Sequence, residues 1–69
     1  MRLFISGVSG YLGTVILKAL EDEPAVSDIV GVDIKPPREG SPKLEFHAVD
    51  VRDHAGIRDA MRGCDVVLH

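Results

Sequence analysis

Three glycines near the start of the chain are spaced in a way that suits phosphate binding. Gly7, Gly10 and Gly13 recur at every third residue, directly after the apolar run Leu3–Ile5. The first permits a sharp turn, the second lets the main chain approach a pyrophosphate, and the third lets a helix pack closely on a strand. A helix starting at this loop would direct free N–H groups at the phosphates. The pattern predicts a dinucleotide-binding loop; the alternative is three turn glycines without a ligand.

An acidic residue follows at the separation that this chemistry requires. Asp33 ends the apolar run Ile29–Val32 and lies 20 residues after Gly13. At that spacing a carboxylate can accept hydrogen bonds from the ribose hydroxyls of NAD, and it repels the 2′-phosphate of NADP. Lys35 and Arg38 provide the opposing argument, because both could attract that phosphate. We expect them to be solvated in a proline-rich loop, so NAD is the favoured cofactor and NADP the less favoured one.

The elements that must position these residues alternate along the chain. Four short, largely apolar runs predict strands over residues 3–5, 29–32, 44–48 and 66–68. One helix is predicted after the glycines and before Pro24, and a second between the N-cap Asp53 and the C-terminal Gly63. Between the second and third strands, the prolines of residues 34–43 predict a surface loop. This alternation predicts an α/β fold with a doubly wound parallel sheet in the order 3-2-1-4.

The side chains of these elements also predict what each element buries. The first helix carries one apolar stripe, made of Tyr11, Leu12, Val15, Ile16, Ala19 and Leu20, and the second carries Ile57, Ala60 and Met61. The third strand alternates apolar and polar residues, as an edge strand does. The fourth strand would be the opposite edge although it is wholly apolar, and such an edge normally has a neighbour. We therefore expect the sheet to be incomplete.

Composition excludes several other kinds of site. The 69 residues carry 8 Lys or Arg and 11 Asp or Glu, a net charge of −3, which argues against binding to nucleic-acid phosphates. One cysteine, Cys64, allows no internal disulfide, and the histidines lack Cys partners at zinc-ligand spacing. No apolar run approaches the ~20 residues of a membrane span, and Met1–Ile5 is too short for a signal-peptide core. We expect a cytoplasmic protein with no metal, nucleic-acid or membrane partner.

The glycine loop and three later segments of the sequence resemble those of a known family. The segment Ser6–Gly13 is similar to the Thr-Gly-x-x-Gly-x-x-Gly loop of extended short-chain dehydrogenases/reductases, the NAD-dependent epimerase/dehydratase family. Ser6 replaces the usual threonine but keeps a hydroxyl. Three further segments match in order, Gly31–Asp33, His47–Asp53 and Cys64–His69. The resemblance implies a partial Rossmann fold, with residues 1–69 as the N-terminal part of one NAD(P)-binding domain and the substrate-binding part absent.

The resemblance also implies roles for individual residues. Tyr11 and Leu12 would offer backbone N–H groups to the pyrophosphate, and Ile34 would hold the adenosine ribose together with the acid before it. Asp50 would contact the adenine amino group, with Val51 against the ring. The alternatives are ordinary packing for the side chains of Tyr11 and Val51, and a turn-capping role for Asp50.

No catalytic residue is expected within these 69 residues. The chemistry of the resembled family needs a Tyr-x-x-x-Lys pair, yet the only tyrosine is Tyr11 and the next lysine is Lys18. The chain is therefore expected to be the NAD-binding segment of an epimerase/dehydratase-type oxidoreductase, acting on a nucleotide sugar or a related hydroxyl or carbonyl substrate. Its parent would be a homodimer. The alternative is a redox sensor of the same fold that binds the dinucleotide without turnover.

Overall fold

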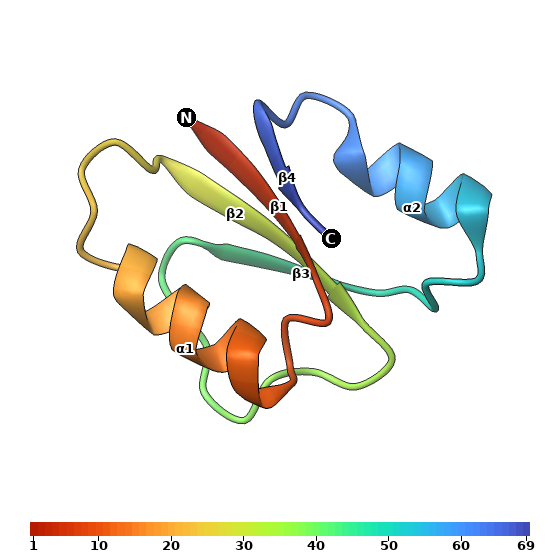
Figure 1. The fold of residues 1–69 in the computed structure, drawn as a ribbon, viewed down its shortest axis with the longest axis horizontal. Helices are drawn as coiled ribbons and strands as arrows, with labels where there is room; N and C mark the ends of the chain where they lie inside the picture. The colour runs from red at the N-terminus through yellow and green to blue at the C-terminus, as the bar shows by residue number, and fades with distance from the viewer.

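Four parallel strands form the centre of the molecule, which a computed structural model describes over residues 1–69 (Figure 1). The elements in chain order are β1 (Arg2–Ser6), α1 (Tyr11–Leu20), β2 (Asp28–Asp33), β3 (Leu44–Ala48), α2 (His54–Met61) and β4 (Val66–Leu68). The strands lie in the order β3-β2-β1-β4, and every neighbouring pair is parallel. Both the predicted α/β class and the predicted strand order are confirmed.

The two helices cover opposite faces of the sheet. Successive side chains of a strand point to opposite faces, so β1 and β2 contribute to two separate apolar clusters. The cluster on the α1 face consists of Leu3, Ile5, Val8, Leu17, Val26 and Ile29. The cluster on the α2 face consists of Phe4, Val30, Val32 and Ile57. Because both faces are covered, β1 and β2 are apolar at nearly every position.

The helix α1 buries only part of the predicted stripe. Ile16 and Leu20 of the stripe pack on the core of the sheet together with Leu17, which the stripe did not include. Of the predicted stripe, Ala19 is exposed, and Tyr11, Leu12 and Val15 expose 87%, 69% and 48% of their surface. Apolar side chains occupy most of the circumference of this helix, so periodicity alone does not select the buried face. The close approach of Gly13 to the preceding loop selects it.

The second half of the chain follows the predicted pattern closely. The carboxylate of Asp53 accepts a hydrogen bond from the Gly56 N–H at 3.0 Å and caps α2. Gly63 has a φ of 78°, the left-handed conformation expected after a helix C-terminus. On the α2 face of β3, Glu45 and His47 are exposed, as on an edge strand. Residues 34–43 form neither helix nor strand.

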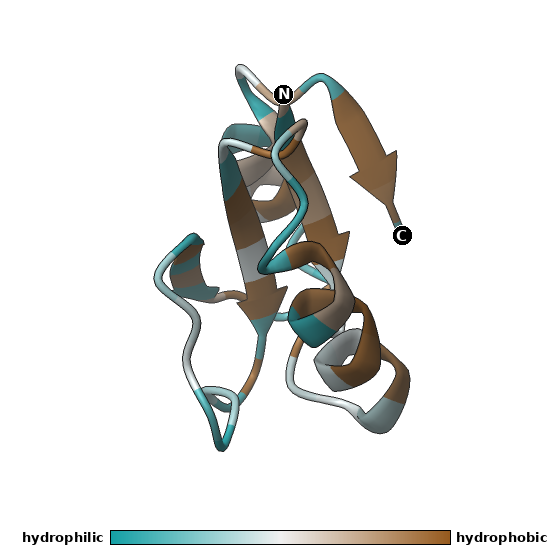
Figure 2. Cartoon of the chain, turned by 90° about the vertical axis from the view of Figure 1, so that its left-hand side faces the viewer, coloured by the Kyte–Doolittle hydropathy of each residue, from teal (hydrophilic) through white to brown (hydrophobic).

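The strand β4 is an apolar edge. It pairs only with β1, in the register Leu3↔Val66 and Ile5↔Leu68. Figure 2 shows β4 as a hydrophobic strand beside the C-terminus with no strand on its outer side. Its three residues expose between 38% and 45% of their surface. The structure thus confirms an apolar strand at the sheet edge. None of the helices is long and apolar enough to span a bilayer.

Candidate functional site

The three glycines of the loop between β1 and α1 differ in why the position requires a glycine. Gly7 has a φ of 65°, a conformation that side chains disfavour. At Gly13 a Cβ atom would lie 2.4 Å from the carbonyl oxygen of Gly7 and 2.8 Å from backbone atoms of Val8. Gly10 has an extended backbone, and a Cβ there would meet only the Gly7 oxygen, at an ordinary 3.4 Å. The conformation of the chain requires glycine at positions 7 and 13. At position 10 neither the backbone conformation nor a close contact within the chain requires glycine.

The loop is fastened to the end of β2 by hydrogen bonds. The Val8 N–H donates to the Val32 carbonyl at 3.2 Å, and the Ser9 N–H donates to Asp33 Oδ2 at 3.0 Å. Asp33 Oδ1 accepts from the Ile34 N–H at 2.7 Å. The structure therefore brings the predicted acid directly to the glycine loop. Each carboxylate oxygen holds one protein donor and retains capacity for another.

The start of α1 is open to an anion. Gly10 is the N-cap residue of the helix, and no side chain caps the first-turn N–H groups. The first turn also carries no acidic residue. The backbone N–H groups of Tyr11 and Leu12 belong to the first turn, where a helix provides no internal acceptor. The positive end of the helix dipole lies at the same place. The Tyr11 ring is almost fully exposed, so it takes no part in core packing.

Two depressions flank the glycine loop. One, of about 360 Å³, is lined by residues of the loop and α1 and by the end of β4, including Gly7, Leu12, Gly13, Leu68 and His69. The other, of about 510 Å³, is lined by Ser9, Gly10, Tyr11, Thr14, Lys18, Arg38 and Glu39. The loop thus forms a ridge between an apolar hollow beside β4 and a charged hollow beside the β2–β3 connection.

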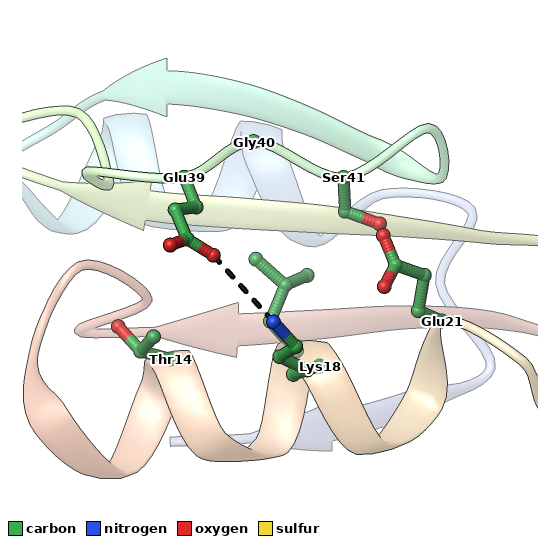
Figure 3. Close-up of a pocket in the computed structure, with 7 residues that line it drawn as sticks. Thr14, Lys18, Glu21, Glu39, Gly40 and Ser41 are labelled. Atoms are coloured by element: carbon green, nitrogen blue, oxygen red, sulfur yellow. Dashed lines mark ion pairs between the residues drawn. The ribbon is translucent and has the colours of Figure 1, made fainter.

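The β2–β3 connection lies along α1 and is held there (Figure 3). Lys18 Nζ pairs with Glu39 Oε2 at 3.7 Å, over a small cavity of about 100 Å³ whose lining includes Glu21 and Ser41. Further along, Lys43 Nζ donates to the carbonyl oxygens of Leu20 and Glu23 at 3.3 and 2.8 Å. Within this connection Lys35 and Arg38 are exposed, as expected for solvated cations.

Asp50 lies at the same end of the sheet as the glycine loop, because the neighbouring Val49 N–H donates to the Asp33 carbonyl at 3.1 Å. Its carboxylate accepts from the Arg52 N–H at 2.9 Å and from Arg52 Nη2 at 2.7 Å. The Arg52 side chain, followed by its backbone N–H, lowers the pKa of Asp50 from 3.8 to about 2. Asp50 therefore caps the turn that follows it, which is the role stated above as the alternative to contact with adenine. Val51 is half exposed.

Two features of the site were missed by sequence reasoning. Val8 is fully buried, and its methyl groups lie 2.9 Å from where a Cβ of Gly31 would stand. A glycine inside an apolar strand is the signal for such a close approach. Ser9 was also missed: its hydroxyl donates to the Lys35 carbonyl at 2.5 Å, 26 residues away. No spacing rule points to that contact.

The chain is similar in sequence to known proteins. Residues 3–69 match the model of the NAD dependent epimerase/dehydratase family. The chain is 32% identical over 77 residues to a UDP-glucose 4-epimerase of Rickettsia akari (strain Hartford), covering 97% of this chain and 23% of the relative. It is 33% identical over 69 residues to an uncharacterized protein of Mycobacterium tuberculosis (strain ATCC 25618 / H37Rv), covering the whole chain and 8% of the relative.

Solved structures show the same arrangement. A mutant uronate dehydrogenase from Agrobacterium tumefaciens, complexed with NAD, superposes with a TM-score of 0.80 at 27% identity, covering 96% of this chain and 24% of the dehydrogenase. The chain therefore spans at most about a quarter of the length of these proteins. The four parallel strands in the order 3-2-1-4 and the two helices form a partial Rossmann-like fold. With its glycine loop, its acid at the end of β2 and a family match over residues 3–69, the chain belongs to the NAD dependent epimerase/dehydratase family, whose cofactor is a nicotinamide dinucleotide.

Proposed function

We propose that residues 1–69 bind the adenosine diphosphate half of NAD, as the N-terminal part of a longer NAD-binding domain. The main support for this proposal is the presence of a glycine at position 10. Its backbone is extended and its missing Cβ would make only one ordinary contact, so the fold gives no reason for a glycine there. A pyrophosphate resting on the main chain supplies that reason. The uncapped start of α1, directly beyond Gly10, adds the donors that such a group needs.

The other predicted contacts fit around this position. The backbone N–H groups of Tyr11 and Leu12 would donate to the pyrophosphate. Asp33 and Ile34 would hold the adenosine ribose, because the Asp33 oxygens keep one free acceptor site each after binding Ser9 and Ile34. Asp50 and Val51 would approach the adenine.

NAD is favoured over NADP by the charge beside the ribose. Asp33 is held at the loop by the Ser9 N–H, and a carboxylate there repels a 2′-phosphate. The exposed cations Lys35 and Arg38 lie beyond Asp33 on the connection to β3.

The parent protein would be an oxidoreductase of the extended short-chain dehydrogenase/reductase type. When bound, the nicotinamide accepts and returns a hydride; residues 1–69 position its adenosine end. The UDP-glucose 4-epimerase relative and the uronate dehydrogenase neighbour support a nucleotide sugar or a related hydroxyl or carbonyl compound as the substrate. We further propose a homodimeric cytoplasmic parent whose substrate-binding part comes from residues outside this segment.

The decisive test is Gly10→Val, with NAD affinity measured by calorimetry on the longer parent protein. We expect binding to fall by at least about 100-fold, because the new methyl groups would occupy the space of the pyrophosphate. Circular dichroism should show the fold retained. Gly40→Val is the matched control, since a Cβ at Gly40 meets nothing within 4 Å, and it should bind NAD normally. Wild-type NAD affinity in Gly10→Val would refute the proposal.

A second measurement separates an oxidoreductase from a dinucleotide sensor. The parent protein should convert a suitable sugar nucleotide or hydroxyl substrate, with NAD reduced either transiently or in net turnover, and its sequence should contain a Tyr-x-x-x-Lys pair. Tight NAD binding without that pair and without turnover would favour the sensor.

A further inference from the structure

Ser9 links the glycine loop to the end of β2 in two ways. Its backbone N–H donates to Asp33 Oδ2 at 3.0 Å. Its hydroxyl donates to the carbonyl oxygen of Lys35 at 2.5 Å. The first bond needs only a backbone N–H, which every residue except proline provides, whereas the second requires a hydroxyl. A single residue therefore holds both the acid and the residue two positions beyond it.

The hydrogen bond of the Ser9 hydroxyl lies beyond the last backbone pairing of β2 with its neighbouring strands. The pairing of β2 with β1 ends at Val32, and its pairing with β3 ends at Asp33. Ile34 and Lys35 lie outside every strand and are exposed. The next side-chain contact of the connection with α1 is the exposed ion pair of Glu39 with Lys18 at 3.7 Å. Between the sheet and that ion pair, the Ser9 hydroxyl supplies an anchor for the corner formed by residues 33–35.

The corner controls which charges face the loop. The Ile34 N–H at the corner donates to Asp33 Oδ1, so moving the corner also releases the carboxylate on that side. Arg38 follows the corner, lines the charged hollow together with Ser9 and Gly10, and has no ion-pair partner. A freed corner would let the carboxylate turn away and let Arg38 swing toward the place of a 2′-phosphate.

We propose that Ser9 is a positioning residue for cofactor choice, because its hydroxyl fixes the 33–35 corner with the Asp33 carboxylate at the glycine loop and the cations beyond it. This inference rests on the proposed function, since it assumes that the adenosine ribose lies at Asp33. It adds that the preference for NAD depends on a neutral hydroxyl in the loop as well as on the acid itself.

The test compares Ser9→Ala and Ser9→Thr in the longer parent protein. Calorimetry gives the dissociation constants of NAD and NADP, and hydrogen exchange without cofactor gives the protection of the Ile34 amide. In Ser9→Ala we expect about fivefold weaker NAD binding, the loss typical of one neutral hydrogen bond. NADP binding should be unchanged or tighter, and the Ile34 amide should exchange faster. Ser9→Thr keeps a hydroxyl and should restore both readouts.

Ser27→Ala is the matched control. Its hydroxyl lies 3.0 Å from the carbonyl oxygen of Met1, also 26 residues away, and 2.8 Å from Asp28 Oδ1, both at the amino end of β2. It removes a comparable hydrogen bond without touching the corner, so the NAD to NADP ratio should stay at the wild-type value.

Each outcome decides the proposal. A wild-type ratio in Ser9→Ala overturns it, as does an equal loss of NAD and NADP binding. The same loss in Ser9→Thr as in Ser9→Ala overturns the role of the hydroxyl. If the wild-type protein binds NAD but Ser9→Ala changes nothing, only this inference fails. If the wild-type protein binds no NAD, the proposed function fails with it.

Discussion

The strands β2 and β4 flank β1 on its two sides, and their comparison separates composition from environment. Phe4 of β1 pairs with Val30 on one side and with Val67 on the other. Val30 exposes 1% of its surface and Val67 exposes 45%. The two residues are chemically identical, but β2 is followed by β3 and covered by a helix on each face, whereas nothing lies beyond β4. An apolar strand sequence therefore indicates that neighbouring strands and helices are needed to bury it. It does not show that those elements are present in the same segment.

The largest effect is expected where α1 covers the β2 side. In Gly13→Ala the new Cβ would stand 2.4 Å from the Gly7 carbonyl oxygen and 2.8 Å from the Val8 backbone. Neither neighbour is a flexible side chain, so the helix must move off the sheet. We expect a loss of about 3 kcal/mol in the free energy of unfolding, measured with urea. Gly40→Ala should change it by less than about 0.5 kcal/mol. Similar losses for both would show that α1 is loosely seated.

The matched valines give the direct test of the comparison. We expect Val30→Ala to lower the free energy of unfolding of residues 1–69 by about 2 kcal/mol, through lost burial and the cavity left behind. Val67→Ala should cost less than about 1 kcal/mol, since that side chain is half exposed. Equal costs in this chain would contradict the structure. Equal costs only in the longer parent protein would show that its other residues cover β4.

The next effect concerns Asp33, the last residue of β2. Replacing Asp33 by Asn removes the charge that repels a 2′-phosphate. We expect the affinity for NADP relative to NAD to rise about tenfold, equivalent to ~1.4 kcal/mol, measured by calorimetry with both dinucleotides. A wild-type protein that already binds NADP more tightly would show instead that Lys35 or Arg38 controls the choice.

The smallest effect is expected at the exposed end of β3. Arg52 lowers the pKa of Asp50 from 3.8 to about 2, so folding favours the ionised carboxylate. Its contribution to stability is present above about pH 4 and is lost as the pH falls through about 2. In Arg52→Ala the pKa should return toward 3.8, as followed by NMR titration of the carboxyl carbon. Arg62→Ala, which removes the partner of Asp59, should leave the Asp50 titration unchanged.

The elements and their order follow from sequence because local and global signals agree. The apolar runs of β1 and β2 require two covered faces, and alternation with helices then leaves few parallel topologies. The helix limits are equally local, since Asp53 caps its own helix and Gly63 adopts the left-handed conformation that glycine favours. The glycine loop and the acid at position 33 are recognisable because their spacing is set by one turn and one helix.

The rest depends on contacts between distant residues. The buried face of α1 is set by Gly13 against the loop, and a helix with apolar residues on most sides does not reveal that choice. Ser9 contacts Lys35 across 26 residues, through a backbone carbonyl that any residue could supply. By contrast, the contact of Asp50 with Arg52 is local, two residues along the chain, and it is the turn contact stated as the alternative for this residue. The contact of Asp50 with adenine stays a prediction.

The pairing of β1 with β4 has a consequence for biosynthesis. The Arg2 N–H donates to Asp65 Oδ2 at 2.9 Å, and the Asp65 N–H returns a bond to the Arg2 carbonyl at 2.8 Å. Of the four strands, β1 is synthesised before the other three and is thus the last to gain its second neighbour. At about 5–20 residues per second, that wait lasts roughly 3 to 13 s. Throughout it, a nascent chain exposes one open edge of an apolar strand, the kind of surface on which misassembly begins. Codon changes that slow translation before Val66 should therefore lower the yield of folded protein without altering its final stability.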